Sequence, residues 1–339
     1  MGNIYGVDVG TSNLKMFCKD KEIILNEKNI IAIVNKRDLL AFGDEAYEMY
    51  EKAPENIEVS YPVKFGVIAD IENMQTLLLS FFNKINGDKK TAGSTDFYIA
   101  VPTDVTEVEK RAFYELVADS KVKAKNIYIV DKPVADAIGA GLDVTKSRGI
   151  MIVNIGAETT EISVLSLGGI VISKSVKIGG NKLDDSIISN VRKVYNLVIG
   201  SKTAESLKKE LGSAIQTEEK FAPGFGRNVL SGLPVSIDIS SDVIYSAIVD
   251  PLHSIMDSIK VILERTPPEL AADIIKNGIY VSGGTSNIQN LQQFINQETN
   301  LAVNIVENPS ESVVRGLMGV VSNPEFAKVA YTPQDKNYE

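Results

Sequence analysis

The stretch Val7-Asp8-Val9-Gly10-Thr11-Ser12-Asn13, at the end of an apolar segment close to the amino terminus, decides the fold. A similar stretch recurs as Val153-Asn154-Ile155-Gly156-Ala157-Glu158-Thr159. A second apolar segment follows each of them, at residues 14–17 and 161–166, so each copy predicts two antiparallel strands joined by a tight turn. The repetition indicates a duplicated unit.

Bulk composition narrows the class of protein. A chain of 339 residues predicts two or more domains. The net charge of −9 argues against nucleic acid as a partner. A single cysteine, Cys18, and a single histidine, His253, exclude an internal disulfide and a histidine-rich metal site, so any metal would be held by oxygen. With neither a secretory signal nor an apolar run of bilayer length, we expect a cytoplasmic location.

Strand and helix patterns alternate along the rest of the chain, which predicts an α/β fold. Thr106 and Glu109 form a capping-box pattern at the start of one helix. We predict strands at residues 96–101, 126–130, 278–281 and 302–306, and helices at 107–120, 133–141, 184–196, 203–211, 241–265, 290–298 and 310–321. The polar tail at 331–339 predicts disorder.

Three glycine turns at the ends of apolar strands are candidates for phosphate binding. Gly10-Thr11-Ser12-Asn13 offers consecutive backbone N–H groups and hydroxyls, which bind phosphate oxygens. Asp8, on the strand before this turn, could hold Mg²⁺ through water. The third turn, Gly283-Gly284-Thr285, lets a nucleotide approach its backbone closely. Taken alone, each turn is better explained as an ordinary connection between two elements, and it is the occurrence of three such turns, two of them repeats of each other, that favours phosphate binding.

Several further motifs give the chain a recognisable pattern over nearly its whole length. They are Ile99-Ala100-Val101-Pro102, Ala137-Ile138-Gly139-Ala140-Gly141-Leu142, Ile178-Gly179-Gly180-Asn181-Lys182-Leu183-Asp184 and Thr203-Ala204-Glu205. With the two hairpins, they resemble the actin-like ATPase superfamily, shared by actin, Hsp70 and hexokinase, and within it the MreB family of bacterial cell-shape proteins. The resemblance implies a duplicated actin-like, ribonuclease H-like fold with ATP or ADP bound in a cleft.

The resemblance also implies where the parts and the site lie. It places a first large domain (IA) at 1–30, 67–143 and 312–331, a small one (IB) at 31–66, a second large domain (IIA) at 144–180 and 242–311, a small one (IIB) at 181–241, and the tail at 332–339. The nucleotide-binding residues it implies are Asp8, Gly10, Thr11, Ser12, Asn13, Gly156, Ala157, Glu158, Thr159, Gly180, Glu205, Lys208, Gly283, Gly284 and Thr285. Asp8 and Asn154 would hold Mg²⁺ through water, and Thr159 would take part in catalysis.

The second phosphate loop departs from the family pattern, which reads Asp-Ile-Gly-Gly-Gly-Thr. Asn154 replaces the aspartate, and an amide brings no negative charge to a metal ion, so Mg²⁺ should be held more weakly. Glu158 replaces a glycine beside an anionic phosphate, a like-charge contact that disfavours binding.

A larger departure precedes the helix that begins near Pro133, where the family has Glu-Glu-Pro and this chain has Asp131-Lys132-Pro133. The family's second glutamate activates water, and a charged lysine cannot accept a proton, so hydrolysis should be very weak or absent. We hypothesise an ion pair between Lys132 and Glu158; independent drift of the two positions is the alternative. Asp131 as a substitute base is less favoured, because neighbouring side chains of an extended segment point to opposite faces.

The resemblance implies self-association into filaments of paired protofilaments, with MreB paralogues as further candidate partners. Location at the inner face of the cell membrane would need an apolar element, and the loop at 86–94 offers two lysines without a large apolar residue. Two readings of function remain: a cytoskeletal ATP-binding subunit, or an active ATPase or sugar-kinase-like enzyme. Lys132 favours the first, because a kinase needs a base near its acceptor.

Overall fold

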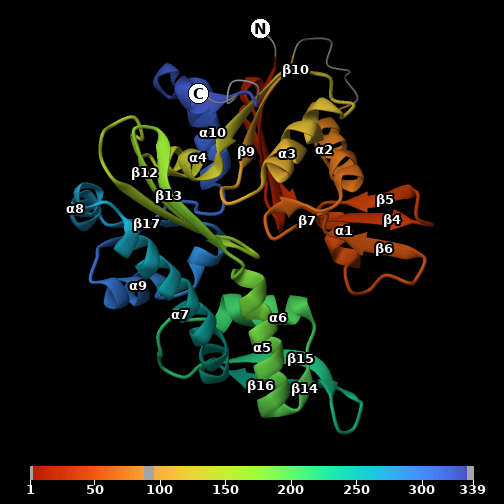
Figure 1. Ribbon diagram of the computed structural model, residues 1–339. Coiled ribbons are helices and arrows are strands. Elements are labelled where there is room, and N and C mark those ends of the chain that lie inside the picture. The colour runs from red at the N-terminus through yellow and green to blue at the C-terminus, as the bar shows by residue number, and fades with distance from the viewer. Residues whose placement is uncertain (1–2, 88–94, 334–339) are drawn as a thin grey trace. The chain divides into compact units, whose positions relative to one another are not determined.

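The computed structural model describes residues 3–87 and 95–333, which form two compact units (Figure 1). The first unit comprises Met1–Arg148, Leu165–Ser173 and Ser310–Glu339, and the second comprises Gly149–Val164 and Lys174–Pro309. The finer division into four parts at the boundaries given above stays a prediction.

A six-stranded sheet forms the centre of the first unit. Its order is β19-β10-β9-β1-β2-β3. The first hairpin, β1 and β2, continues antiparallel into β3, whereas β9 and β10 join β1 in parallel. The bounds are β1 Ile4–Val9, β2 Asn13–Cys18, β3 Ile23–Lys28, β9 Thr95–Val101, β10 Ala124–Asp131 and β19 Ala330–Tyr331. The predicted hairpin and the two predicted parallel strands are thereby confirmed.

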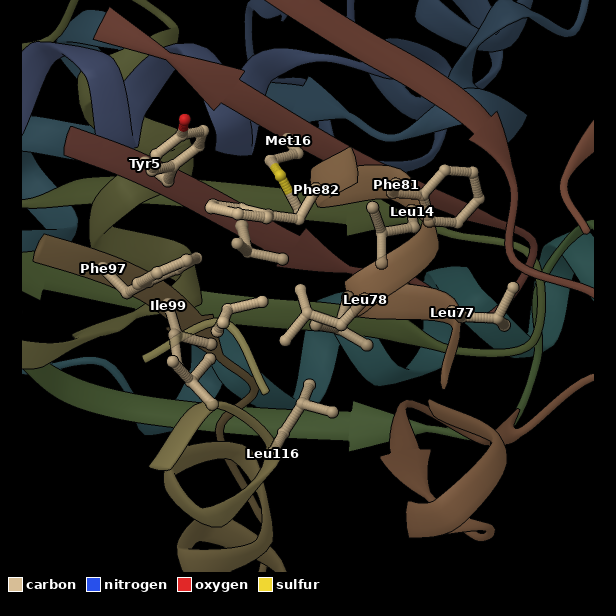
Figure 2. Close-up of a cluster of buried hydrophobic side chains, with 14 of the residues drawn as sticks. Tyr5, Leu14, Met16, Leu77, Leu78, Phe81, Phe82, Phe97, Ile99 and Leu116 are labelled. Carbon is tan, nitrogen blue, oxygen red and sulfur yellow. The ribbon is translucent and has the colours of Figure 1, made fainter. Parts of the chain in front are cut away.

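Helices lie on both faces of this sheet, with α2 and α3 on one side and α4 and α10 on the other (Figure 1). Alternate residues of β1, namely Tyr5, Val7 and Val9, are buried in the core beneath α2 and α3 because successive strand side chains point to opposite faces. Figure 2 shows Phe97 and Ile99 of β9 in the same core. The helices are α2 Ile71–Asn86, α3 Glu107–Ala118, α4 Lys132–Gly139 and α10 Ser312–Ser322.

The start of α3 follows the capping box read from the sequence. The Glu109 backbone N–H donates to the Thr106 hydroxyl at 3.2 Å, and the Thr106 backbone N–H donates to the Glu109 carboxylate at 2.7 Å. Two donors that an isolated helix end leaves without partners are thus satisfied. The predicted start of this helix is confirmed.

A second sheet, built mostly from the second unit, repeats the strand arrangement of the first. Its order is β13-β12-β11-β17-β18, with β17 parallel to both β11 and β18, and residues Leu165–Ser173 at the end of β12 and in β13 are grouped with the first unit. The strands are β11 Ile150–Ile155, β12 Thr160–Ser166, β13 Gly169–Val176, β17 Ile279–Ser282 and β18 Val303–Ile305. A three-strand meander followed by parallel strands therefore occurs twice, which confirms the predicted duplication and fold class.

The helices of the second unit are α5 Gly180–Tyr195, α6 Ser201–Leu211, α7 Ser241–Arg265, α8 Pro268–Asn277 and α9 Leu291–Thr299. The bounds of α7 match the prediction, whereas α5 begins at Gly180, earlier than predicted. At that earlier start, the Gly180 backbone N–H donates to Gly156 O, which lies outside the helix and far away in sequence, at 3.0 Å. A tertiary contact of this kind gives no periodic signal in the sequence.

Each unit also carries smaller sheets. In the first unit, β4 Ile31–Val34, β5 Asp38–Phe42 and β6 Ile57–Ser60 form a sheet beside α1 Asp44–Met49, and β7 Val63–Lys64 pairs with β8 Val67–Ile68. In the second unit, β14 Leu197–Val198, β15 Phe221–Asn228 and β16 Pro234–Ser240 form a sheet with the order β14-β15-β16. Within the described residues, no helix is long and apolar enough to cross a lipid bilayer.

The prediction of a disordered tail from Tyr331 is wrong at its first residue. Tyr331 lies in β19, where it pairs with Ile129 of β10, and its hydroxyl donates to Asp131 at 2.8 Å. This contact joins residues 200 positions apart, so local polarity could not indicate it. Residues 334–339 of the tail, and residues 88–94 of the loop considered for membrane contact, lie outside the described residues.

Helices α4 and α10 approach so closely that only glycine fits between them. A Cβ added to Gly316 would collide with the Ala135 carbonyl, and one added to Gly139 would collide with the Ser312 carbonyl. The start of α4 is thereby fixed against the core of the first unit. The Ser312 hydroxyl donates to Asp136 O across the same contact at 3.0 Å.

We expect Gly316→Ala to lower the free energy of unfolding by about 1 to 3 kcal/mol, since the added methyl group must push two packed helices apart. Urea denaturation monitored by circular dichroism measures this loss. Gly169→Ala is the control, because Ser166 O would lie at an ordinary contact distance of 3.8 Å from the new Cβ. Equal stability of the two variants would contradict the close packing of α4 and α10.

Candidate nucleotide-binding site

The first glycine turn, at residues 10–13, is held in shape by backbone and amide contacts within the first unit. The Asn29 side chain donates to Gly10 O and the Asn29 backbone N–H donates to Ser12 O, both at 2.8 Å. From the β7–β8 turn, the Gly66 N–H donates to the Thr11 hydroxyl at 3.2 Å. Because segments distant in sequence fix the turn, its N–H groups are arranged before any ligand arrives.

Asp8 lies directly before this turn and is paired with Lys15. The two residues face each other in the register of β1 and β2, and the Lys15 ammonium lies 3.1 Å from Asp8 Oδ2. Only 13% of the Lys15 side chain and 5% of the Asp8 side chain are exposed. Lys15 is missing from the residues predicted above, although a turn read as a tight hairpin would have placed it opposite Asp8.

A second lysine reaches the same turn from β3. The Lys28 ammonium donates to the Ser12 hydroxyl at 3.3 Å and lies 4.5 Å from the centre of the Tyr47 ring. The turn that was predicted to bind phosphate is therefore flanked by two ammonium groups. This arrangement suits an anionic ligand.

The second turn, at residues 156–159, begins the site in the second unit. Its Gly156 N–H donates to Thr159 O at 2.8 Å, which closes the turn. The start of α5 packs against it backbone to backbone: Gly180 N–H donates to Gly156 O at 3.0 Å, and Asn181 N–H donates to Ala157 O at 2.7 Å. A Cβ on Gly179 would collide with Ala157.

The third turn, at residues 283–285, contacts the same carbonyl. The Thr285 hydroxyl donates to Gly156 O at 2.8 Å. Gly283 has a φ of +85°, and a Cβ there would collide with the Ile155 carbonyl, so both its conformation and its neighbours require glycine. The turn continues into a 3-10 helix at Gly284–Asn287.

Helix α6 supplies the fourth predicted segment through Lys208. Its ammonium donates to Gly180 O at 2.9 Å and to Asp184 Oδ2 at 2.8 Å. Glu205, one helical turn earlier, forms an ion pair with Lys209 at 2.8 Å. The structure thus brings together the predicted residues Gly156, Gly180, Lys208 and Thr285 within one unit, joined by hydrogen bonds.

The buried environment of Asp184 changes its acidity. Burial raises the pKa of Asp184 to about 6, even though the ammonium of Lys208 lowers it. Its other oxygen, Oδ1, is buried without a hydrogen-bond partner. Because the charged carboxylate is costly to bury, Asp184 keeps its proton in the folded protein up to about pH 6, well above its usual acidic range.

Lys132 is the first residue of α4, directly after β10 and Asp131. The Asp131 carboxylate accepts a hydrogen bond from the Tyr331 hydroxyl, and burial and this negative charge both raise the pKa of Tyr331. Asp131 is therefore engaged with the carboxyl-terminal segment, which weakens its reading as a substitute base. Lys132 belongs to the first unit and Glu158 to the second, and the hypothesised ion pair between them stays a prediction.

The residues expected to hold Mg²⁺ do not fit that ion well. Asn154 offers a neutral amide, and the Asp8 carboxylate is already paired with the Lys15 ammonium. In residues 3–87 and 95–333, no group of three or more His, Cys, Asp and Glu is arranged to hold a metal. Cys18 is buried, and His253 is exposed with its ring 5.2 Å from Phe294, as expected of residues outside a site.

Comparison with known proteins decides the family. The family model described as MreB/Mbl protein matches residues 2–328. The chain belongs to the MreB/Mbl family. It is 37% identical over 320 residues to the cell shape-determining protein MreB of Escherichia coli (strain K12), which covers 93% of this chain and 92% of that protein. The MreB/Mbl match therefore spans both units.

Solved structures of this family have the same fold. MreB5 of Spiroplasma citri bound to ADP superposes with a TM-score of 0.90 at 33% identity, covering 97% of this chain and 98% of that one. The same protein bound to AMPPNP gives a TM-score of 0.88, covering 94% and 96%. The MreB/Mbl family thus includes a structural relative that binds both a nucleoside diphosphate and a triphosphate analogue.

The raised pKa of Asp184 predicts a pH-dependent stability. In the folded protein Asp184 holds its proton up to about pH 6, whereas in the unfolded chain it loses it near 3.8, so this group's stabilising contribution falls as the pH rises through about 6. We expect the native protein to lose roughly 1 kcal/mol more stability than Asp184→Asn between about pH 5 and about pH 7.

Urea denaturation of both proteins at the two pH values measures this difference. Asp185→Asn, at the exposed neighbouring position on α5, is the matched control. If native protein and Asp184→Asn lose stability in parallel, the Asp184 carboxyl does not titrate in this range.

Proposed function

We propose that this chain is an MreB-type subunit that binds ATP or ADP and assembles with copies of itself into cytoskeletal filaments acting on cell shape. The observation that carries the proposal is the convergence of Gly180, Lys208 and Thr285 on the turn that contains Gly156. Family membership and the nucleotide-bound MreB5 structures support it. Filament assembly and contacts with MreB paralogues rest on the resemblance to actin-like proteins.

The four predicted segments suit the two ends of a nucleotide differently. Glycine turns with closely packed backbones present N–H groups, which suit phosphate oxygens. Lys208 and Glu205 on α6, with Gly283–Thr285, suit the ribose and base, as the resemblance implies. We assign the phosphates to residues 10–13 and 156–159, and the adenosine to the segments around Lys208 and Thr285.

Very weak or absent hydrolysis is part of the proposal. Lys132 stands where the family has the glutamate that activates water, and an ammonium cannot take a proton from water. Because Asp131 is hydrogen-bonded to Tyr331, it is poorly placed to take over. An active ATPase or sugar-kinase-like enzyme is the competing function, and no observation here favours it. We propose a location in the cytoplasm, with filaments able to lie along the inner face of the cell membrane.

Nucleotide-dependent assembly is the central expectation. With ATP or a non-hydrolysable analogue, we expect light scattering to rise and electron microscopy to show filaments, with phosphate release far below one per subunit during assembly. If the γ-phosphate favours assembly, ADP alone should give fewer filaments. Rapid phosphoryl transfer to water or to a small acceptor such as a sugar would contradict the proposal.

Restoring the family residue tests the assignment of Lys132. We expect Lys132→Glu combined with Glu158→Gly to raise the phosphate-release rate at least about tenfold, since general-base catalysis typically contributes about 10² to 10⁴. Lys125→Glu, an exposed charge reversal on β10 away from its end, is the control. No gain in the double variant would show that these positions do not limit turnover.

A further inference from the structure

Residues 229–233, which we call the apolar tip, join β15 to β16 in the second unit. The register of these two strands ends at the pair Arg227 and Pro234, so the apolar tip extends past the sheet (Figure 1). Leu230 is 82% exposed and Leu233 is 63% exposed. Large apolar side chains that are exposed together often mark a contact surface.

The exposed face of β15 continues this apolar surface. Residues two apart in a strand point to the same side, and Phe221 and Phe225 are both exposed on one face of β15. Ala222 is buried on the opposite face, where α6 packs against β15. The leucines of the apolar tip therefore end a longer apolar strip and are not isolated.

The backbone of the apolar tip does not need water for its N–H groups, because each N–H group of residues 229–233 already has an acceptor. The acceptors are the Asn228 side-chain oxygen for Leu230 and Ser231, both at 2.9 Å, the Asn228 carbonyl for Gly232 at 2.9 Å, the Ser231 hydroxyl for Leu233 at 3.3 Å, and the Asn196 carbonyl for Val229 at 2.8 Å. A backbone N–H group without a partner is costly to remove from water. The N–H groups of this turn therefore add little to the cost of entering an apolar medium.

Basic side chains lie beside the apolar tip. Arg227 is on β15, two residues before Val229, and Arg192 and Lys193 are in the last turn of α5. The end of α5 contacts the apolar tip through the hydrogen bond from Val229 N–H to Asn196 O. All three basic residues are exposed, and within residues 3–87 and 95–333 none of them is held in an ion pair.

Acidic residues are missing from the two chain segments that form this end of the second unit. Residues 186–204 and 220–237 contain no Asp or Glu. The acids on neighbouring elements are engaged or lie toward the opposite end of the small sheet: Glu205 is paired with Lys209 on α6, Asp238 faces Pro223 in the β15–β16 register, Glu219 accepts a hydrogen bond from Ser240, and Asp242 lies in the first turn of α7. The surroundings of the apolar tip are thus basic, although the chain has a net charge of −9.

A lipid surface fits this combination of features. Leucines on a projecting turn enter acyl chains without needing a pocket of complementary shape, and basic side chains beside them attract anionic headgroups. We propose that the apolar tip inserts Leu230 and Leu233 into the surface of an anionic bilayer, with Arg192, Lys193 and Arg227 against the headgroups. The inference rests on the membrane location proposed above and names the element that makes the contact.

Flotation with vesicles of phosphatidylglycerol and phosphatidylcholine tests the leucines, using the full chain without nucleotide. We expect Leu230→Ser combined with Leu233→Ser to lower vesicle binding at least about tenfold, since a buried leucine contributes at least that much. Ile275→Ser, at a position 68% exposed on α8 of the same unit, is the matched control and should bind as the native chain does. Equal binding by the native chain and the double variant would overturn the inference.

Vesicles of phosphatidylcholine alone test the basic residues. Each cationic side chain near an anionic surface contributes about fivefold to binding, so we expect the native chain to bind neutral vesicles at least about tenfold more weakly. Arg192→Gln combined with Lys193→Gln should remove most of this difference, whereas Lys276→Gln, an exposed lysine on α8, should leave it unchanged. Equal binding of the native chain to both kinds of vesicle would contradict the assignment of the basic residues.

A tryptophan reporter tests insertion directly, because the chain contains no tryptophan. We expect the fluorescence of Leu230→Trp to shift to shorter wavelength when anionic vesicles are added, since the indole ring leaves water. Ile275→Trp should show no shift. If Leu230→Trp floats with the vesicles without a shift, the contact lies elsewhere and the inference is overturned.

Assembly without lipid distinguishes a lipid contact from a contact between copies of the chain. Both leucines are exposed, so we expect the double serine variant to give an unchanged thermal melt and to assemble with ATP as the native chain does, measured by light scattering. Loss of assembly in a folded variant would make the apolar tip an interface between copies and overturn the inference. If the native chain binds no vesicles, the inference and the membrane location both fail, whereas nucleotide binding and assembly are measured without lipid and stand independently.

Discussion

The carbonyl oxygen of Gly156 accepts hydrogen bonds from two segments that are far apart in sequence, through the Gly180 N–H and the Thr285 hydroxyl. The rest of the site in the second unit depends on this arrangement. Lys208 then ties Gly180 to Asp184, so that a turn, two helices and a second turn form one hydrogen-bonded network. Because each contact uses backbone or buried polar groups, loss of one leaves others without partners.

Glycine makes this closeness sterically feasible. At Gly179 a Cβ would collide with Ala157, and at Gly283 one would collide with Ile155. The same principle acts in the first unit, where Gly139 and Gly316 let α4 and α10 touch and so fix the position at which Lys132 begins its helix. Close backbone approach thus serves two purposes in this chain: it joins the glycine turns of the second unit to one another and to α5, and it sets helix positions in the first unit.

Charge is distributed differently in the two units. In the first unit, the ammonium groups of Lys15 and Lys28 lie at the Gly10 turn, and that of Lys15 is paired with Asp8. In the second unit, Lys208 is largely neutralised by Asp184, whose raised pKa reflects burial. Together with lysine at position 132, these charges are the basis on which we propose a site that holds an anion rather than one that activates water.

The sequence by itself determined the duplicated hairpins, the α/β class, the α3 capping box and the three glycine turns, because these depend on local periodicity and on backbone preferences of single residues. The β19 pairing of Tyr331 has no signal in the local sequence. Helix α2 was not predicted either, but its regular apolar spacing is a signal that could have been recognised. Only the tertiary structure decided that Asp8 is paired with Lys15, that Lys208 meets Asp184, and that Gly156 joins three segments. Such contacts depend on which elements meet in space, and residues distant along the chain leave no periodic trace of their meeting.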